Sequence, residues 1–299
     1  MAPGTQHEQG SAAPEPGLPS FVARVAAHGR ELYRDLPWRR TRDPYAVLLS
    51  EVMLQQTQVP RVVGRYETWL AEFPTIDALA AAPLTRVLEE WRGLGYNRRA
   101  VALHRAAEQV GERFAGTLPA DEKLLRALPG IGPATAAGVL AFAFDLPAVY
   151  LETNVRAVFL HELFADRDGV PDREIVPFVS AAMSEAVRQG VCPREWYYAL
   201  LDYGAQLKRT QPNPSRRSAH HTRQSRFDGS RRQKRAWLLR EVMARPGLSA
   251  EEYAQSLATA ELQACRDAPA TADVTAILED LAAEGFLARD ATGDTWSVA

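Results

Sequence analysis

Short apolar runs, in which hydrophobic residues recur at spacings of three and four, are the feature of this sequence that most restricts its fold. The clearest runs cover residues 47–54, 76–88 and 101–110, and strict alternation never persists for more than a few residues. Prolines and glycines such as Pro74 and Gly116 punctuate the pattern. Such spacings place apolar side chains on one face of a helix, and the breakers end each helix. The pattern therefore predicts an all-α body of short helices with brief connections.

The composition is that of a globular protein and excludes several other classes. Of the 299 residues, 46% are hydrophobic and 24% are charged, which excludes a wholly disordered chain and fits about two domains. No stretch approaches the roughly 20 apolar residues that cross a bilayer, so no membrane partner is expected. Residues 1–18 are rich in Gly, Pro and Ala, without the features of a signal peptide, and are interpreted as a disordered tail.

Charge is segregated along the chain, although the net charge is only −2. Residues 208–235 hold ten Lys or Arg and one acid, Asp228, whereas residues 236–299 hold four basic and eleven acidic residues. A partner that carries phosphate groups would meet the basic stretch. The alternative is a solvated linker, and charge alone leaves the two interpretations equally open.

The C-terminal part of the chain predicts a separate module. Residues 210–230 contain prolines, serines and basic residues, and are interpreted as a basic linker. Residues 237–243 and 274–282 have helical apolar spacing, and residues 286–298 have the pattern of a two-stranded ribbon that turns near Gly293. Helices followed by a ribbon predict a small winged-helix-like α+β module at residues 231–299.

The sharpest local signal is the sequence LPGIGPAT at residues 128–135. Asp121 can cap a short helix before it, and Pro133 suits the first position of the helix after it. Gly130 and Gly132 permit a tight reversal that exposes backbone N–H groups at a positive helix end. Such a site suits a DNA phosphate and reads no base sequence. An ordinary connection between two helices is the alternative, and the hairpin taken alone favours it.

Several motifs in order resemble the helix-hairpin-helix DNA glycosylases. They are PWR at 37–39, SEVMLQQTQ at 50–58, GLGY at 93–96, the hairpin at 128–135 and LDYGA at 201–205. Within that superfamily the resemblance is closest to the A/G-specific adenine glycosylases, and it covers roughly residues 21–207. It implies a glycosylase core at 19–209, with a six-helix lobe at about 44–149 and a second lobe from 19–43 and 150–209. It also implies double-stranded DNA as the partner, bent and with one nucleotide rotated into a pocket.

The resemblance assigns two carboxylates to the cleavage of an N-glycosidic bond, in which cationic charge develops on the sugar as the base leaves. Glu51 matches the family's general acid, and its apolar neighbours at residues 52–54 favour the protonated form. Glu152 falls on the family's catalytic aspartate, and Asn154 on the asparagine that orients this turn. Glutamate keeps the charge but adds a methylene, which displaces the carboxylate. The alternatives are a surface glutamate for Glu51 and a structural role for Glu152.

The resemblance assigns further residues to base recognition and DNA contact. Gln55 matches the wedge that fills the gap left by the rotated nucleotide, and the second tyrosine common after GLGY is Asn97 here. The expected base pocket and wedge comprise Trp38, Arg39, Gln55, Gln56, Tyr96 and Asp202. The expected phosphate contacts are Gly130, Ile131, Gly132 and Thr135 in the hairpin, and Arg216, Arg217, Arg223 and Arg226 in the basic linker. Lobe packing or a helix-end salt bridge is the alternative role for Trp38, Arg39 and Asp202.

Two departures from the family pattern define the variant. Relatives that also cleave the strand carry a lysine two residues after the hairpin's last glycine; that position is Ala134 here, which predicts no Schiff-base lyase step. The family's [4Fe–4S] cluster needs four cysteines after the LDYGA motif, yet the first matching position is Lys208 and the two cysteines are Cys192 and Cys265. The cluster is therefore expected to be absent, with the basic linker replacing its DNA-contacting loop. No metal or other cofactor is expected.

These features predict a monofunctional DNA glycosylase of base excision repair that hydrolyses the N-glycosidic bond of a flipped base, with adenine in a mismatch as the favoured substrate. One alternative is a glycosylase for another damaged or modified base, and a second is a DNA-lesion-binding protein with weakened catalysis. We expect a cytoplasmic, nucleoid-associated monomer. The C-terminal module is too short and too helical for the β-rich domain of standard adenine glycosylases. Its negative charge favours a lid or a surface that docks a protein partner.

Overall fold

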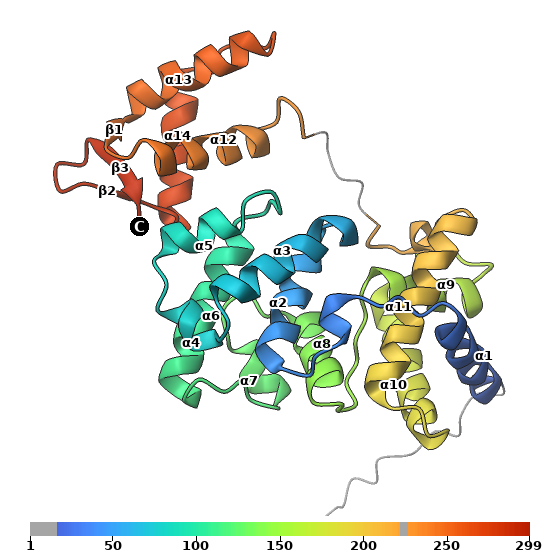
Figure 1. The fold of residues 1–299 in the computed structure, drawn as a ribbon. Coiled ribbons are helices and arrows are strands. Elements are labelled where there is room, and N and C mark those ends of the chain that lie inside the picture. Colours follow the sequence, from blue (N-terminus) through green and yellow to red (C-terminus); the bar gives the residue numbers. More distant parts are fainter. Residues whose placement is uncertain (1–16, 222–226) are drawn as a thin grey trace, which may run out of the picture. The chain divides into compact units, whose positions relative to one another are not determined.

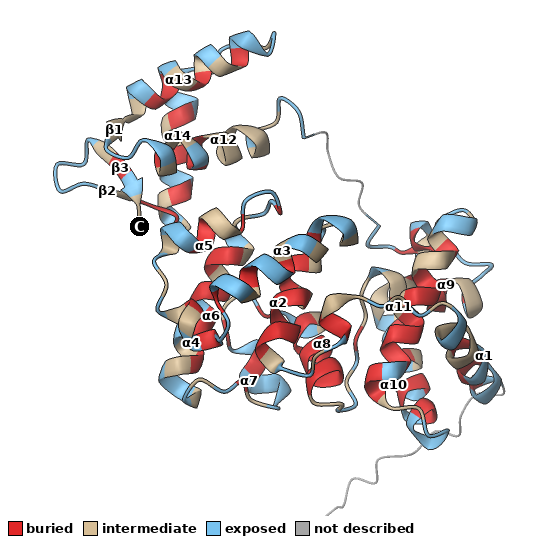
Figure 2. Ribbon diagram, in the orientation of Figure 1, coloured by how far each residue is buried: buried red, intermediate tan, exposed pale blue. Residues whose placement is uncertain are grey.

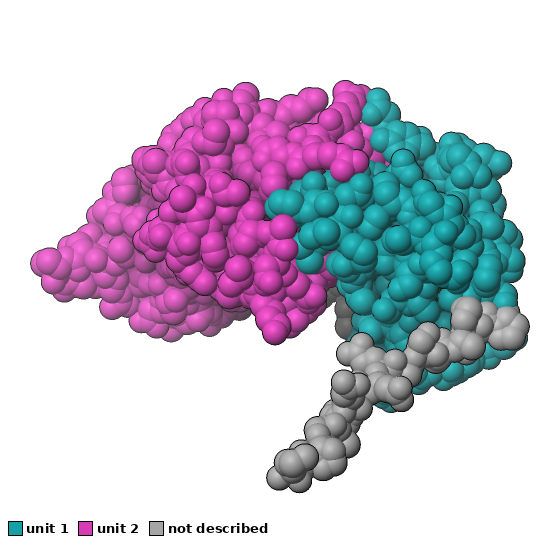
Figure 3. All heavy atoms as spheres, turned by 90° about the horizontal axis from the view of Figure 1, so that it is seen from below, with its two compact units in different colours: residues 1–35, 140–221 teal, residues 36–139, 222–299 magenta. Residues whose placement is uncertain are grey.

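The computed structural model describes residues 17–221 and 227–299, and it confirms the predicted all-α body with a small C-terminal α+β module (Figure 1). Contacts divide the chain into two compact units (Figure 3). Unit 1 comprises residues 1–35 and 140–221, and unit 2 comprises residues 36–139 and 222–299. In the described residues, no helix has both the length and the apolar character needed to cross a membrane.

Unit 1 is a group of helices packed around α11. Its helices are α1 (Leu18–Glu31), α9 (Thr153–Glu162), α10 (Asp172–Arg188) and α11 (Pro193–Thr210). Three buried aromatic rings lie where α1, α9 and α11 meet: the ring centroids of Phe21 and Phe159 are 5.3 Å apart, and those of Phe21 and Trp196 are 6.2 Å apart. Edge-on and tilted aromatic pairs of this kind add to the gain from burying their surface.

The first part of unit 2 is the predicted series of short helices. It contains the 3₁₀ helix η1 (Pro37–Arg39) and the helices α2 (Pro44–Leu54), α3 (Val59–Glu72), α4 (Ile76–Ala80), α5 (Leu84–Glu90), α6 (Arg98–Phe114), α7 (Glu122–Arg126) and most of α8 (Pro133–Ala143). Their buried residues lie on the faces turned toward neighbouring helices (Figure 2). In the core, Trp69 Nε1 donates to Tyr45 Oη at 2.9 Å, and that hydroxyl donates to the Phe73 carbonyl at 3.0 Å. The indole N–H of Trp69 and the hydroxyl of Tyr45 are thus both satisfied within the core.

The C-terminal part of unit 2 has the two helices and the ribbon that the sequence predicted, together with a further helix and a short strand that it did not. It comprises α12 (Arg231–Ala244), β1 (Leu248–Ser249), α13 (Ala250–Gln263), α14 (Thr271–Ala283), β2 (Leu287–Arg289) and β3 (Thr295–Val298). The sheet has the order β1-β3-β2, with Leu287 opposite Val298 and Leu248 opposite Trp296 in antiparallel register. The sequence did not predict β1, because two residues are too short to show an alternating pattern.

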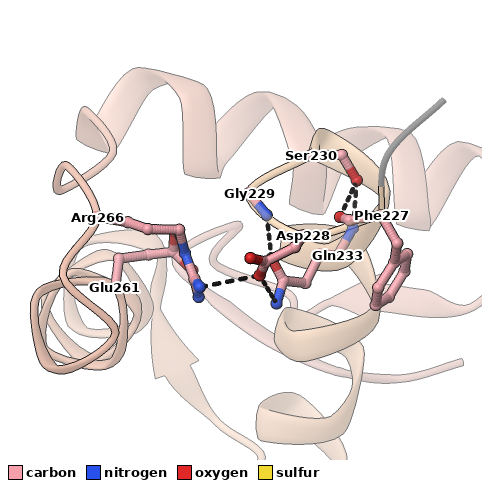
Figure 4. A network of polar contacts seen from close by, with 7 residues as sticks. All are labelled: Phe227, Asp228, Gly229, Ser230, Gln233, Glu261 and Arg266. Carbon is pink, nitrogen blue, oxygen red and sulfur yellow. Dashed lines mark hydrogen bonds and ion pairs between the residues drawn. The ribbon is translucent and has the colours of Figure 1, made fainter.

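Polar contacts hold the start of α12 in place, as Figure 4 shows. Ser230 caps the helix, and its Oγ accepts a hydrogen bond from the Gln233 amide at 3.3 Å. Arg266, just beyond α13, donates to both carboxylate oxygens of Glu261 at 2.8 and 3.0 Å. Its Nη1 also donates to Asp228 Oδ1 at 3.0 Å. These bonds join the segment before α12 to the end of α13.

The first half of the expected basic linker is folded onto unit 1. The 3₁₀ helix η2 (Pro214–Arg217) packs against α9, and Pro214, Ser215 and Ser218 are buried. The sequence predicted a linker or extended arm because this stretch has little apolar content. Hydrogen bonds to distant residues hold it instead, and such bonds leave no periodic pattern in the sequence.

Candidate active site

Glu51 lies on α2, a helix with buried residues on every side. Residues 45–50, 52 and 53 are buried, whereas Glu51 is half-buried. Asp43 caps the helix, and its Oδ1 accepts a hydrogen bond from the Tyr45 amide at 3.0 Å. A helix that is buried all round cannot shift without disrupting the core. Glu51 therefore has a well-defined place within unit 2.

Arg99, on the first turn of α6, holds the end of α2 and two neighbouring turns together. Its Nη1 donates to the carbonyls of Val52, Met53 and Gln55 at 2.7, 3.0 and 2.6 Å. Its Nη2 donates to the carbonyls of Leu94 and Gly95 at 3.3 and 3.0 Å, and to Thr57 Oγ1 at 3.1 Å. The last carbonyls of a helix have no partner within the helix, so this guanidinium satisfies groups that would otherwise need water.

The sequence reasoning missed Arg99. Burial lowers its pKa to about 10, because removal of the guanidinium from water disfavours the charged form. One signal was available: an arginine in the first turn of a helix opposes the helix dipole, so another interaction must compensate for it. Here the carbonyl oxygens provide that compensation.

Gln55 and Gln56, which follow α2, have different surroundings. Gln55 Nε2 donates to Thr135 Oγ1 at 3.0 Å, and Thr135 is buried on α8. The structure therefore brings together the expected wedge and one of the expected hairpin residues. Gln56 is exposed and has a left-handed backbone with a φ of 53°.

Tyr96, another expected pocket residue, has two guanidinium groups close to its ring. Its backbone is left-handed, with a φ of 48°, and its side chain is 38% exposed. The Arg99 Cζ lies 5.6 Å from the centroid of the Tyr96 ring, and the Arg232 Cζ of α12 lies 5.8 Å from it. Arg232 Nη1 also donates to Tyr96 Oη at 3.3 Å. The negative face of an aromatic ring attracts a nearby cation. Because Arg232 belongs to α12, the C-terminal part of unit 2 contributes a positive charge beside this tyrosine.

The hairpin joins α7 to α8 by the turn that the sequence predicted. Asp121 Oδ1 accepts a hydrogen bond from the Leu124 amide at 2.9 Å, which confirms the expected cap. Gly130 has a φ of 73°, and a Cβ built there would lie 2.6 Å from the Ala102 Cβ, so the position requires glycine. Ile131 is buried. The α6 helix therefore supports the turn from one side.

A cavity of about 260 Å³ lies beside the hairpin within unit 2. Pro129, Gly130 and Ile131 form one wall, and Arg98, Arg99, Ala102 and Leu103 of α6 form another, with Val52 and Gln55 of the α2 end completing the lining. Two of the expected phosphate-binding residues and the expected wedge thus share one hollow.

Trp38 and Arg39 lie in the core of unit 2. Each is only 5% exposed, and the Trp38 ring packs edge-on against Tyr66 with the centroids 5.6 Å apart. This contact is the packing role that the sequence left open for Trp38. Their part in base recognition stays a prediction.

Glu152 is the N-cap residue of α9. Its Oε1 accepts hydrogen bonds from the backbone amides of Asn154 and Val155 at 2.5 and 3.0 Å, so the cap uses one carboxylate oxygen. Capping satisfies amides that have no carbonyl partner in the first turn of a helix. The bonds fix the direction of the carboxylate, and the side chain remains half-buried.

Asn154 is held from two sides within unit 1. Lys208 Nζ, on the last turn of α11, donates to Asn154 Oδ1 at 2.9 Å. A Cβ at Gly204 would collide with the backbone of Asn154, so α11 approaches the start of α9 closely. The motif LDYGA at 201–205, recognised in the sequence as a family feature, thus has a structural reason for its glycine.

Asp202, the last expected pocket residue, is almost fully buried in unit 1. Its side chain accepts hydrogen bonds from Arg34 Nε at 2.5 Å and from the Arg34 amide at 3.2 Å. The sequence left a salt bridge open as one role of Asp202, and this contact supplies one. Of the expected linker contacts, Arg216 is exposed and Arg217 is half-buried, while Arg223 and Arg226 lie outside the described residues.

The residues of this chain do not fit the iron–sulfur cluster that the resemblance implies. A [4Fe–4S] cluster is held by four cysteine thiolates. The whole sequence contains two cysteines, with Cys192 at the N-cap of α11 and Cys265 exposed just after α13. Lys208, at the first matching position, is bonded to Asn154.

Comparisons with known proteins give a consistent result. A family model described as HhH-GPD superfamily base excision DNA repair protein matches residues 49–184. An adenine DNA glycosylase of Mycobacterium tuberculosis is 33% identical over 212 residues, which cover 61% of this chain and 70% of that protein. An adenine DNA glycosylase of Mycolicibacterium smegmatis is 35% identical over 204 residues, which cover 60% of this chain and 70% of that protein.

A solved structure of a thermostable thymine-DNA glycosylase has the same fold. It matches with a TM-score of 0.57 at 22% sequence identity, over 66% of this chain and 90% of that chain. The sequence comparisons and the family model agree with the motifs at residues 50–58, 93–96 and 128–135. The chain therefore belongs to the HhH-GPD superfamily of base excision DNA repair proteins and, within it, to the family of the adenine DNA glycosylases.

Proposed function

We propose that this protein is a DNA glycosylase of base excision repair that removes adenine from mismatched double-stranded DNA. The observation that carries the proposal is the setting of Glu51. It lies within an intact SEVMLQQTQ motif on a buried helix that Asp43 caps at one end and Arg99 holds at the other. The names of the curated relatives support adenine as the base.

Glu51 and Glu152 have complementary roles in the proposed reaction. Glu51 donates a proton to the departing base, so that the base leaves in a neutral form. Glu152 stabilises the positive charge that develops on the sugar as the N-glycosidic bond lengthens. A water molecule then adds to C1′ and its proton passes to the Glu51 carboxylate, which completes the hydrolysis and restores the acid. Asn154, whose side chain accepts from Lys208, orients the turn that carries Glu152.

The proposed enzyme is monofunctional and needs no iron–sulfur cluster. Strand cleavage through a Schiff base needs an amine at the reacting sugar, and the position that supplies it in bifunctional relatives is Ala134, the second residue of α8. The expected product is therefore an intact strand with an abasic site. The exposed Arg216 and the hairpin at 128–135 are proposed to contact DNA phosphates.

The test is single-turnover base release from five duplexes that contain 8-oxoguanine:A, G:A, hypoxanthine:T, uracil:G or 8-oxoguanine:C. We expect release of adenine from one or both adenine mismatches, with strand breaks only after alkali and no product trapped by borohydride. Glu51→Gln should slow release by about 10²- to 10⁴-fold, the usual contribution of a general acid. Glu67→Gln, at an exposed carboxylate on α3, is the matched control and should leave the rate unchanged. Release of a different base would refute adenine as the substrate.

One observation favours a second candidate, a lesion-binding protein with weakened catalysis. Glu152 caps α9 through its side chain, which is a structural task that does not require catalysis. This candidate predicts that the mismatched duplexes bind and that none of them loses a base. The same panel of duplexes therefore separates the two functions.

A further inference from the structure

The chain that follows α11 folds back onto the start of α9, the helix that Glu152 caps. Lys208 Nζ donates to Asn154 Oδ1 at 2.9 Å, and Ser215 Oγ donates to the Thr153 carbonyl at 3.2 Å. Thr153 and Asn154 are the first two residues of α9. Two side chains from one later segment thus bind the first turn of this helix.

The same segment is held on its other side by backbone hydrogen bonds. The Val170 amide donates to the Arg217 carbonyl at 2.9 Å, and the Ala219 amide donates to the Val170 carbonyl at 3.0 Å. Ser215 and Ser218 are 4% and 7% exposed. The stretch is therefore tied at both ends of η2, and it cannot move away from α9 without exposing buried polar groups.

The partial burial of the Lys208 ammonium costs free energy, because a charged group loses contact with water. Burial lowers its pKa, because the ammonium leaves water, while the charge of Glu152 raises it and that of Arg156 lowers it. Arg156, the neighbouring cation, is itself held by Asp172 through bonds of 2.8 and 2.6 Å. The hydrogen bond to Asn154 and the nearby charge of Glu152 offset part of this cost.

We propose that Lys208 and residues 213–219, together called the clamp, are a protein-only device that positions Glu152. The clamp holds the first turn of α9, whose Asn154 and Val155 amides in turn direct the Glu152 carboxylate. It occupies the stretch of chain in which the family resemblance implies an iron–sulfur cluster. The catalytic part of this inference rests on the proposed function, because Glu152 needs to be directed at a sugar if the protein is a glycosylase. Lys208 and Ser215 are thus positioning residues that act through Asn154, Thr153 and Glu152.

The test compares Lys208→Met and Ser215→Ala with two controls in the full chain. Arg240→Met removes an exposed cation of α12 that lies outside both the clamp and the basic stretch at 208–235. Ile175→Val removes one methyl group from the core of α10, at a fully buried side chain, and lowers the stability of unit 1 without touching the clamp. Three quantities are measured for each variant: the single-turnover rate of base release at saturating enzyme, the Kd for DNA, and hydrogen exchange at the Asn154 and Val155 amides.

We expect Lys208→Met to slow base release by at least tenfold, toward the roughly 100-fold loss that a 1 Å misplacement causes, with the Kd changed by less than about threefold. Exchange at the Asn154 and Val155 amides should become at least about tenfold faster, because the cap that protects them loosens. Ser215→Ala should show both effects more weakly, and Lys208→Arg should restore part of each. Both controls should match the wild type in the rate, in the Kd and in exchange at the two amides.

Several results would contradict the proposal that the clamp positions Glu152. Equal slowing by Ile175→Val and Lys208→Met would show that stability alone is responsible. Faster exchange with an unchanged rate would show that the segment holds α9 but does not position Glu152, and unchanged exchange would show that it does not hold α9. If the wild type releases no base from any duplex, the proposed function fails. The exchange measurement then still decides whether the clamp holds the cap.

Discussion

The two carboxylates of this protein are held in their units by opposite means. Glu51 lies inside α2, so the helix backbone and its buried neighbours determine where it is. Glu152 lies before α9, so its own hydrogen bonds to the Asn154 and Val155 amides determine where it points. The first arrangement is set by packing, and the second by a small number of polar contacts.

The basic residues that hold the elements carrying Glu51 and Glu152, which are Arg99 and Lys208, also differ in their number of contacts. Arg99 donates to five carbonyl oxygens and to one hydroxyl in unit 2, whereas Lys208 in unit 1 donates to the side chain of Asn154. The planar guanidinium has enough donors in fixed directions for several turns, while an ammonium is a compact point charge. We therefore expect changes near Glu51 to affect mainly stability, and changes near Glu152 to affect mainly catalysis.

The largest effect on stability is expected at Arg99. Arg99→Met leaves buried carbonyls at the end of α2 and in the turn before α6 without a donor, and should lower the free energy of unfolding by about 3 kcal/mol. Urea denaturation measures this loss. Arg98→Ala is the matched control, because Arg98 is the preceding residue, its side chain is 77% exposed, and its ion pair with Glu284 is at the surface. That control should cost less than about 0.5 kcal/mol. Similar losses for the two variants would remove the distinction between the two cations.

The next prediction uses two substitutions at Glu152 to distinguish its capping of α9 from its negative charge. Glu152→Ala removes both, and should lower the free energy of unfolding by about 1 kcal/mol, the usual value of an N-cap. Glu152→Asn keeps a capping oxygen without the charge, and should stay within about 0.5 kcal/mol of the wild type. Both variants should lose base release by about 100-fold or more, since the charge that we propose to stabilise the sugar is gone. Full activity of Glu152→Asn would assign this residue to structure alone.

The smallest effect concerns pH and the support of α9 from α10. The two hydrogen bonds from Arg156 lower the pKa of Asp172 below its usual 3.8. A carboxyl whose pKa is lower in the folded state contributes stability above its unfolded pKa and loses it as the pH falls through the folded value. Wild type should therefore lose stability more steeply below about pH 4 than Asp172→Asn, by less than about 1 kcal/mol because the side chain of Asp172 is 33% exposed. Urea midpoints at pH 6 and at pH 3 measure the difference, and parallel curves would contradict it.

Much of the fold follows from local sequence. The short helices, the Asp121 cap and the hairpin turn at Gly130 all depend on residues within a few positions of one another. The C-terminal ribbon follows from an apolar pattern and a glycine turn in the same way. The SEVMLQQTQ and GLGY motifs indicated the family, and the resemblance assigned Glu51 and Glu152 as its two carboxylates.

The sequence by itself thus determined the helices, the hairpin and the family of this protein. Only the tertiary structure decided what holds the two carboxylates, since Arg99 is 44 residues from Gln55 and Lys208 is 54 residues from Asn154 along the chain. The same holds for residues 213–219, which have the composition of a linker and pack through bonds to Thr153 and Val170. Hydrogen bonds between distant residues depend on where helices come to lie, and no local periodicity records that.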